Sequence, residues 1–175
     1  DADKGHKGIN VLVIERDMEG FVVGAKEDKL GIRGSDTHTL MFTDVKVPKE
    51  NRIGEDGFGF KFAMKTLSGG RIGIAAQALG IASGAYELAL AYSKERKTFG
   101  KEIYKHQAIG FKLADMAMEI KLANLILMES AWKIDQETLT SQDAAMAKLF
   151  CTEMLGKVSD EAIQICGGMG LMADI

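Results

Sequence analysis

The spacing of apolar residues changes once along the chain, from short runs to long helical stripes. Over residues 9–47 the apolar runs are short, and glycines and charged residues interrupt them, which is typical of β-strands. Four short strands are predicted, at residues 9–14, 20–24, 39–42 and 45–47. The only proline, Pro48, follows the last run, and residues 49–59 are polar and glycine-rich. We therefore predict a strand-rich module over residues 1–52.

Beyond Gly57 the apolar residues recur at alternating steps of three and four, which places them on one face of a helix. The first stripe belongs to a helix that ends near Arg96 and contains Ile72, Ala75, Leu79, Ala82, Tyr86 and Ala89. The second contains Ile109, Leu113, Met116, Ile120, Ala123 and Leu127. The third contains Ala144, Ala147, Cys151, Met154, Val158, Ala162 and Ile165. Because such spacing suits shallow antiparallel packing, we predict an up-down bundle over residues 53–175, and an α+β fold overall.

Local signals mark the ends of the third helix, and the second helix shows that the bundle is incomplete. Residues 140–143 read as a capping box, and Gly167-Gly168 supplies the left-handed geometry that often ends a helix. The second helix carries a further apolar face, formed by Phe111, Met118, Leu122 and Leu125. One neighbouring helix cannot bury both faces, which implies a fourth helix or a partner subunit.

Composition excludes several classes of function. The net charge is −3, from 22 basic and 25 acidic residues, so no positive potential favours nucleic acid or an anionic membrane. No window approaches the roughly 18 apolar residues that span a bilayer, so no membrane segment is expected. Cys151 and Cys166 would lie about 22 Å apart on one helix, too far for a disulfide. The three histidines are scattered, which argues against a metal site.

Three segments in the helical part together resemble the acyl-CoA dehydrogenase family, flavoenzymes that desaturate fatty acyl thioesters. They are Arg71–Gly80, then Glu95–Gly100 with Gln107 shortly after, and Gln164–Gly170, which matches Gln-x-x-Gly-Gly-x-Gly. The resemblance is closest to the short-chain, butyryl-CoA type and extends from Lys7 to the last residues. It implies that residues 1–52 are the end of the middle β-domain and that residues 53–175 are most of the C-terminal helical domain.

The resemblance also implies an FAD site. Arg96 would meet the pyrophosphate of an FAD bound to a neighbouring subunit, because a guanidinium offers phosphate a planar set of permanent donors. Thr98 would add a hydroxyl donor, Phe99 an apolar wall, and Gln107, with His106 beside it, hydrogen bonds to the cofactor. Gln164, Gly167 and Gly168 would let backbone approach the diphosphate and ribose. Taken singly, each has a structural alternative: an arginine that complements the helix dipole, a core phenylalanine, a solvated helix start, or a glycine C-cap.

Substrate-binding and catalytic residues follow from the same resemblance. Arg71 would bind the CoA portion of an acyl-CoA, and Ser68 stands where many relatives have an aspartate that contacts it; without the resemblance, residues 68–70 would read as a helix kink. In most of the family the catalytic base is a glutamate beyond the position of Ile175. A minority carries it where this chain has Gly70. We therefore assign no catalytic residue here and expect the chain alone to be inactive.

The resulting expectation is part of an FAD-dependent acyl-CoA dehydrogenase that oxidises a short-chain acyl-CoA to the trans-2-enoyl-CoA. Its electrons would pass to an electron-transferring flavoprotein, it would form a dimer or tetramer, and it would reside in a bacterial cytoplasm or the mitochondrial matrix. Two alternatives stay open. One is a non-catalytic helical assembly module of the same fold, and the other is an acyl-CoA oxidase, which would form peroxide.

Overall fold

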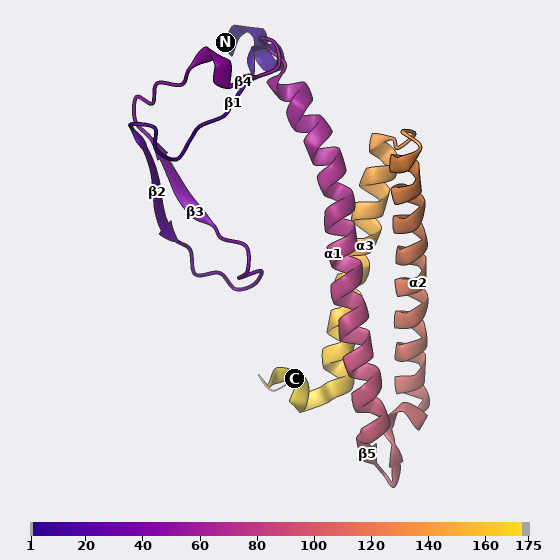
Figure 1. Ribbon diagram of the computed structural model, residues 1–175. Coiled ribbons are helices and arrows are strands. Elements are labelled where there is room, and N and C mark those ends of the chain that lie inside the picture. Colours follow the sequence, from indigo (N-terminus) through magenta and orange to yellow (C-terminus); the bar gives the residue numbers. More distant parts are fainter. Residues whose placement is uncertain (1, 173–175) are drawn as a thin grey trace. The chain divides into compact units, whose positions relative to one another are not determined.

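A computed structural model describes residues 2–172 and divides the chain into two compact units, residues 1–65 and residues 66–175. The first unit holds the strands β1 to β4, and the second holds three long helices (Figure 1). The helix α1, Gly59–Glu95, begins in the first unit and continues through the second. The α+β architecture with an up-down bundle is confirmed; the boundary at 52/53 stays a prediction.

The first unit consists of two short antiparallel pairs. β1, Val11–Leu12, pairs with β4, Arg52–Ile53, and β2, Phe21–Lys26, pairs with β3, His38–Phe42. Apart from Gly59 no described residue of this unit is buried. Two-stranded ribbons are marginally stable by themselves, so this exposure agrees with the expected partial β-domain.

The predicted strand at residues 45–47 is wrong. The β2–β3 pairing ends where the Thr43 amide donates to the Gly20 carbonyl at 2.9 Å, and Asp44 then adopts a positive φ of 52°. That conformation turns the chain away from the ladder, and residues 45–47 form no strand in the described part of the chain. Instead, the short strand β4 forms four residues after Pro48.

The second unit is an up-down arrangement of α1, α2 (Gln107–Asp135) and α3 (Ser141–Cys166), as the alternating colour directions in Figure 1 show. Their apolar stripes form one core, in which alanine is the commonest buried residue of α1 and α3 combines alanines with larger residues such as Met154 and Ile165. All seven predicted stripe residues of α3 are buried. The predicted stripes of α1 and α2 also join the core, with Leu79, Tyr86, Ile109, Ile120 and Leu127 only partly buried.

The predicted ends of α3 are confirmed. The Thr140 hydroxyl accepts from the Asp143 amide at 3.1 Å, and the Asp143 carboxylate accepts from the Thr140 amide at 3.0 Å, which completes a capping box. Lys133, near the end of α2, donates to Asp143 at 2.8 Å and so ties the two helices together. Gly167 caps the other end of α3 with a φ of 60°.

The second apolar face of α2 is exposed, in line with an incomplete bundle. Phe111 and Leu125 show 61% and 52% of their surface, which leaves room for the fourth helix or subunit that the sequence implies.

Helix α1 corrects the expectation about membrane segments. It is long and apolar enough, by length and composition alone, to cross a membrane, with a mean hydropathy of 1.3 in its best window. The reason is the uncharged run 72–86, rich in alanine and glycine; one such helix is a weak sign of a membrane span.

Candidate functional site

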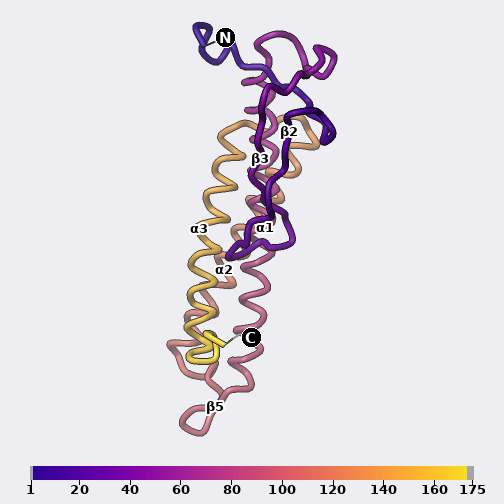
Figure 2. The backbone as a smooth tube through the Cα atoms, turned by 90° about the vertical axis from the view of Figure 1, so that its left-hand side faces the viewer, coloured from indigo at the N-terminus to yellow at the C-terminus, as the bar shows by residue number. Residues whose placement is uncertain are grey.

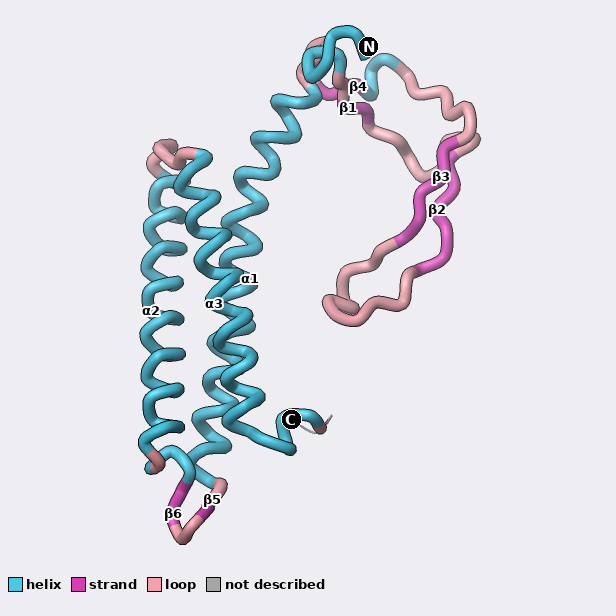
Figure 3. Tube along the Cα trace, turned by 180° about the vertical axis from the view of Figure 1, so that it is seen from behind, coloured by secondary structure: helices cyan, strands magenta, loops and turns pink. Residues whose placement is uncertain are grey.

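A pocket of about 490 Å³ lies at one end of the bundle. The last turn of α1, the hairpin of β5 (Lys97–Thr98) and β6 (Lys101–Glu102), the start of α2 and the end of α3 meet there, and Figures 2 and 3 show this end with the hairpin projecting beyond the helices. Its lining residues are Tyr92, Arg96, Thr98, Ile103, His106, Ile109, Ile165, Cys166, Gly167, Gly168 and Met169. The volume falls in the range of small-molecule and cofactor sites.

The hairpin aims Arg96 and Thr98 at this pocket. The Arg96 amide still donates to the Tyr92 carbonyl at 2.9 Å, as in a helix, while the Arg96 carbonyl accepts from the Ile103 amide at 2.9 Å, as in a ladder. Arg96 is thus the point where helix becomes hairpin. Successive strand residues face opposite sides, so Arg96 and Thr98 share the pocket side and Lys97 faces away from it.

The turn of the hairpin displays Phe99. Phe99 and Gly100 have φ values of 50° and 79°, as a tight two-residue hairpin turn requires. The Phe99 side chain is 97% exposed and makes an edge contact with the His106 ring, with centroids 6.2 Å apart. An aromatic residue at positive φ is strained, and this one gains no burial for that strain. It does not line the pocket.

Charges around the hairpin leave Arg96 available to a ligand. The Glu102 carboxylate pairs with Lys105 at 2.6 Å and with Lys97 at 3.7 Å. The hydrogen bond from Lys105 lowers the pKa of Glu102 to about 2. Within residues 2–172 Arg96 forms no ion pair, and no carboxylate lines the pocket. A cation without a counter-charge in a largely apolar pocket suits an anionic ligand that also carries an apolar or aromatic part.

The glycine corner after α3 forms the opposite wall. Gly167 has φ 60° and ψ −137°, a conformation essentially restricted to glycine. A Cβ on Gly170 would lie 2.8 Å from the Ile163 carbonyl oxygen, so only glycine fits there. A Cβ on Gly168 would meet no atom within 4 Å and φ there is not positive, so the fold does not require glycine at this position. Its lack of a side chain leaves the pocket wall open to close approach by a ligand.

Thr98 and His106 hold the two sides of the hairpin base together. The Thr98 hydroxyl lies 3.0 Å from His106 Nε2, and the Thr98 carbonyl oxygen lies 3.4 Å from the same nitrogen. His106 is also the residue just before α2, where its carbonyl accepts from the Gly110 amide at 3.0 Å. The hairpin is thereby fixed to the start of α2.

The structure brings five of the eight predicted cofactor residues into one pocket: Arg96, Thr98, His106, Gly167 and Gly168. Phe99, Gln107 and Gln164 are exposed and lie outside it. Their predicted roles as cofactor residues, like those of the other five, stay predictions.

The predicted substrate residues Ser68 and Arg71 lie elsewhere on the same helix. α1 runs through residues 68–70 as one continuous helix, and the alternative of a kink there stays a prediction. Arg71 is 25 residues before Arg96, which corresponds to about 37 Å along a helix axis. The two predicted sites of one chain are therefore well separated.

Several lining residues were not predicted as site residues. Ile109 and Ile165 were placed in the core stripes, and Tyr92, Ile103, Cys166 and Met169 carried no signal of their own. Burial raises the pKa of the Cys166 thiol, so this cysteine contributes an uncharged wall. Ile109 and Ile165 are the first and last residues of their predicted stripes, where the core face opens into the pocket.

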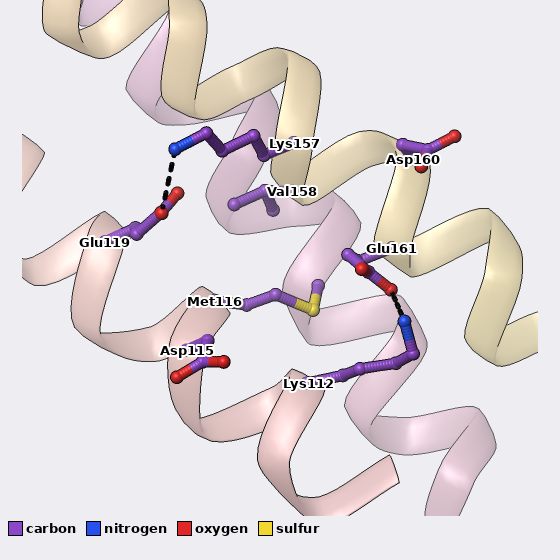
Figure 4. A pocket seen from close by; sticks show the side chains of 8 residues that line it. All are labelled: Lys112, Asp115, Met116, Glu119, Lys157, Val158, Asp160 and Glu161. Carbon is purple, nitrogen blue, oxygen red and sulfur yellow. Dashed lines mark hydrogen bonds and ion pairs between the residues drawn. The ribbon is translucent and has the colours of Figure 1, made fainter. Parts of the chain in front are cut away.

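A second cavity, of about 270 Å³, lies between α2 and α3 (Figure 4). Lys112 on α2 pairs with Glu161 on α3, and Lys157 on α3 pairs with Glu119 on α2 at 3.3 Å. The two pairs have opposite polarity and flank buried apolar side chains at the floor. None of the predicted site residues lies there, and the paired charges are typical of an interhelical contact.

Comparison with known proteins bears on the same helical region. A family profile described as "Acyl-CoA dehydrogenase, C-terminal domain" matches residues 57–175. The chain belongs to the acyl-CoA dehydrogenase family. The resemblance seen in the sequence is therefore confirmed, and the matched region contains the whole pocket.

Relatives and solved structures agree with this assignment. The chain is 50% identical over 170 residues to a short-chain specific acyl-CoA dehydrogenase of Megasphaera elsdenii, covering 97% of this chain and 44% of that protein. It is 45% identical to the mouse mitochondrial short-chain enzyme, covering 100% and 42%. The solved butyryl-CoA dehydrogenase of M. elsdenii superimposes with a TM-score of 0.96 at 48% identity, covering 100% of this chain and 46% of that one. The chain thus spans less than half the length of these relatives.

Proposed function

We propose that this chain is part of an FAD-dependent acyl-CoA dehydrogenase that oxidises a short-chain acyl-CoA to the trans-2-enoyl-CoA. The observation that carries the proposal is the meeting of Arg96, the Thr98 hydroxyl and the open Gly167-Gly168 corner in one pocket, where residues 2–172 supply neither an ion pair to Arg96 nor a lining carboxylate. Family membership, shown for residues 57–175, supports the same activity.

The residues present fit FAD. Arg96 would hold the diphosphate by charge-assisted hydrogen bonds, with Thr98 beside it. Gly168 would allow phosphate or ribose to approach the backbone, because no Cβ fills that space. The apolar walls formed by Tyr92, Ile103 and Met169 suit a flat ring. When bound, FAD supplies the hydride acceptor of the reaction.

The separation of the two predicted sites supports a shared cofactor. Hydride transfer requires contact between flavin and acyl chain, and a CoA held at Ser68 and Arg71 lies about 37 Å along α1 from Arg96 of the same chain. Such a separation is compatible with an Arg96 that serves a cofactor whose flavin works at another chain, and we propose a homodimer or homotetramer in which neighbouring subunits complete each FAD site. Phe99, displayed at the hairpin tip, suits such a cross-subunit contact.

Relatives support the substrate, the electron acceptor and the compartment. The named short-chain enzymes support a short acyl chain. A solved structure that matches at 47% identity carries the description "Electron transferring flavoprotein of Acidaminococcus fermentans", and a caffeyl-CoA reductase-Etf complex subunit of Acetobacterium woodii matches at 42%. We propose such a flavoprotein as the acceptor. Bacterial and mitochondrial relatives support either a bacterial cytoplasm or the mitochondrial matrix.

A chimera tests the proposal. This chain replaces the matching segment of the M. elsdenii short-chain enzyme, which it resembles at 50% identity, and the product is assayed for bound flavin and butyryl-CoA oxidation. Bound FAD that butyryl-CoA bleaches is expected, with electron-transferring flavoprotein as the acceptor. A folded oligomer without flavin would overturn the proposal.

Three further measurements accompany the chimera. The chimera with Arg96→Met should fold but retain less FAD, because methionine keeps the length and loses the charge. Peroxide formed at the rate of butyryl-CoA consumption, without added acceptor, would instead identify an oxidase. The 175-residue chain by itself, supplied with FAD, should give no turnover.

A further inference from the structure

The hydrogen bond between Thr98 and His106 can form in two ways, which differ in which side chain is the donor. A neutral imidazole carries its proton on either Nδ1 or Nε2. If Nε2 is bare, the Thr98 hydroxyl donates its proton to it, and Thr98 can then only accept from a ligand. If Nε2 carries the proton, His106 is the donor, and the Thr98 hydroxyl proton is free to point elsewhere.

The carbonyl of Thr98 decides between these states. A carbonyl oxygen can only accept, and it lies 3.4 Å from Nε2, on the same side as the hydroxyl at 3.0 Å. An unprotonated Nε2 would place its lone pair against a lone pair of the Thr98 carbonyl oxygen, whereas an Nε2–H can donate to both the carbonyl oxygen and the hydroxyl oxygen of Thr98. Within residues 2–172 Nδ1 makes no hydrogen bond that would favour the other tautomer.

We infer that His106 is a positioning residue: its Nε2–H donates to Thr98, which turns the Thr98 hydroxyl proton into the pocket toward an anionic oxygen of the ligand. This inference rests on the proposed function. It changes the role expected for His106 from the sequence, since the imidazole acts through Thr98 instead of on the cofactor. Arg96 and Thr98 then present only donors, as a diphosphate requires.

The tautomer is tested directly by NMR on this chain, which contains only three histidines, His6, His38 and His106. Long-range ¹⁵N–¹H spectra at about pH 9, where imidazole is neutral, identify the protonated nitrogen. Loss of one signal set in His106→Gln assigns the residue. We expect the proton on Nε2; a proton on Nδ1 would overturn the inference.

Substitutions test the consequence for the ligand, with ADP as a diphosphate probe followed by NMR titration. Gln carries a side-chain N–H at the reach of Nε2, so His106→Gln should bind ADP as the unaltered chain does. His106→Leu and Thr98→Val should each weaken binding by about tenfold, and together by no more than either alone. Thr98→Ser should retain affinity, and His38→Gln is the matched control.

The outcomes separate this inference from the proposed function. Equal loss in His106→Gln and His106→Leu would show that the donor at Nε2 is not what matters and would overturn the inference. An Nε2 proton in this chain, together with a chimera that folds as an oligomer but retains no FAD, would leave the tautomer established and count against the proposed function.

Discussion

Three glycines within four residues of the corner after α3 are expected to respond differently to the same substitution by alanine. At Gly170 the new Cβ would lie 2.8 Å from the Ile163 carbonyl oxygen and 3.2 Å from Cys166 Cβ. The carbonyl belongs to the helix backbone and cannot move aside without unwinding the end of α3. The expected cost is that of overpacking, about 1–3 kcal/mol of the free energy of unfolding.

At Gly167 the cost has another origin. The space around its Cβ position is open, but its φ of 60° and ψ of −137° are almost inaccessible to alanine, which costs about 1–3 kcal/mol. At Gly168 neither penalty applies. Alanine there should change stability by no more than about 0.5 kcal/mol, or raise it slightly by restricting the unfolded chain. Its effect should fall on ADP affinity, because the methyl group would fill the pocket wall.

Urea unfolding of this chain, followed by far-UV circular dichroism, measures all three variants. In thermal melts, each kcal/mol should correspond to about 2–4 °C for a chain of this size. Gly156→Ala is the matched control, since Gly156 lies inside α3 with open space around it and should gain up to about 1 kcal/mol. If Gly170→Ala proved as stable as Gly168→Ala, the close approach of η4 (Gly167–Leu171) to α3 would be refuted.

Three further predictions concern charges and caps. Lys112→Glu should lower the free energy of unfolding by up to about 1 kcal/mol, and the added change Glu161→Lys should restore it, as a double-mutant cycle would measure; additive losses would contradict a direct pair. The Lys133 and Thr140 hydrogen bonds lower the pKa of Asp143 from 3.8 to about 2. A carboxyl group whose pKa is lower in the folded state stabilises the fold at pH values above its unfolded pKa, so its contribution to the free energy of unfolding is lost as the pH falls from about 4 toward 2. In Asp143→Asn, the free energy of unfolding should therefore change less with pH over this range. An unchanged pH dependence would refute the reasoning. Thr140→Ala should cost about 1 kcal/mol in urea unfolding through loss of the cap, while Thr140→Ser should cost little, and equal losses would contradict the capping role.

The helices could be predicted from the sequence because their determinants are local. A stripe with steps of three and four has one possible inward face, so all seven predicted residues of α3 are buried. The capping box needs only residues three positions apart, and it forms as predicted. The strands depend on partners far along the chain. Residues 45–47 have strand-like composition but find no partner strand among residues 2–172, whereas Arg52–Ile53 pair with a strand about 40 residues earlier.

The site shows the same division between local and distant determinants. His106 and Gln107 are adjacent in sequence, yet His106 is the N-cap residue with an extended backbone and Gln107 is the first residue of α2, and only His106 lines the pocket. Gln164 is likewise turned to solvent while Ile165 and Cys166 point inward. A motif read as a row of residues cannot show this rotation.

The conformation and exposure of Phe99 are both unfavourable for this chain taken by itself. It combines a φ of 50° with a side chain that is 97% exposed, so strain and unburied apolar surface both count against it in this chain. Glycine at this position would relieve the strain, and a polar residue would remove the exposed surface. A phenylalanine there is favourable only if something outside the chain covers the ring, which agrees with an FAD site completed by two subunits.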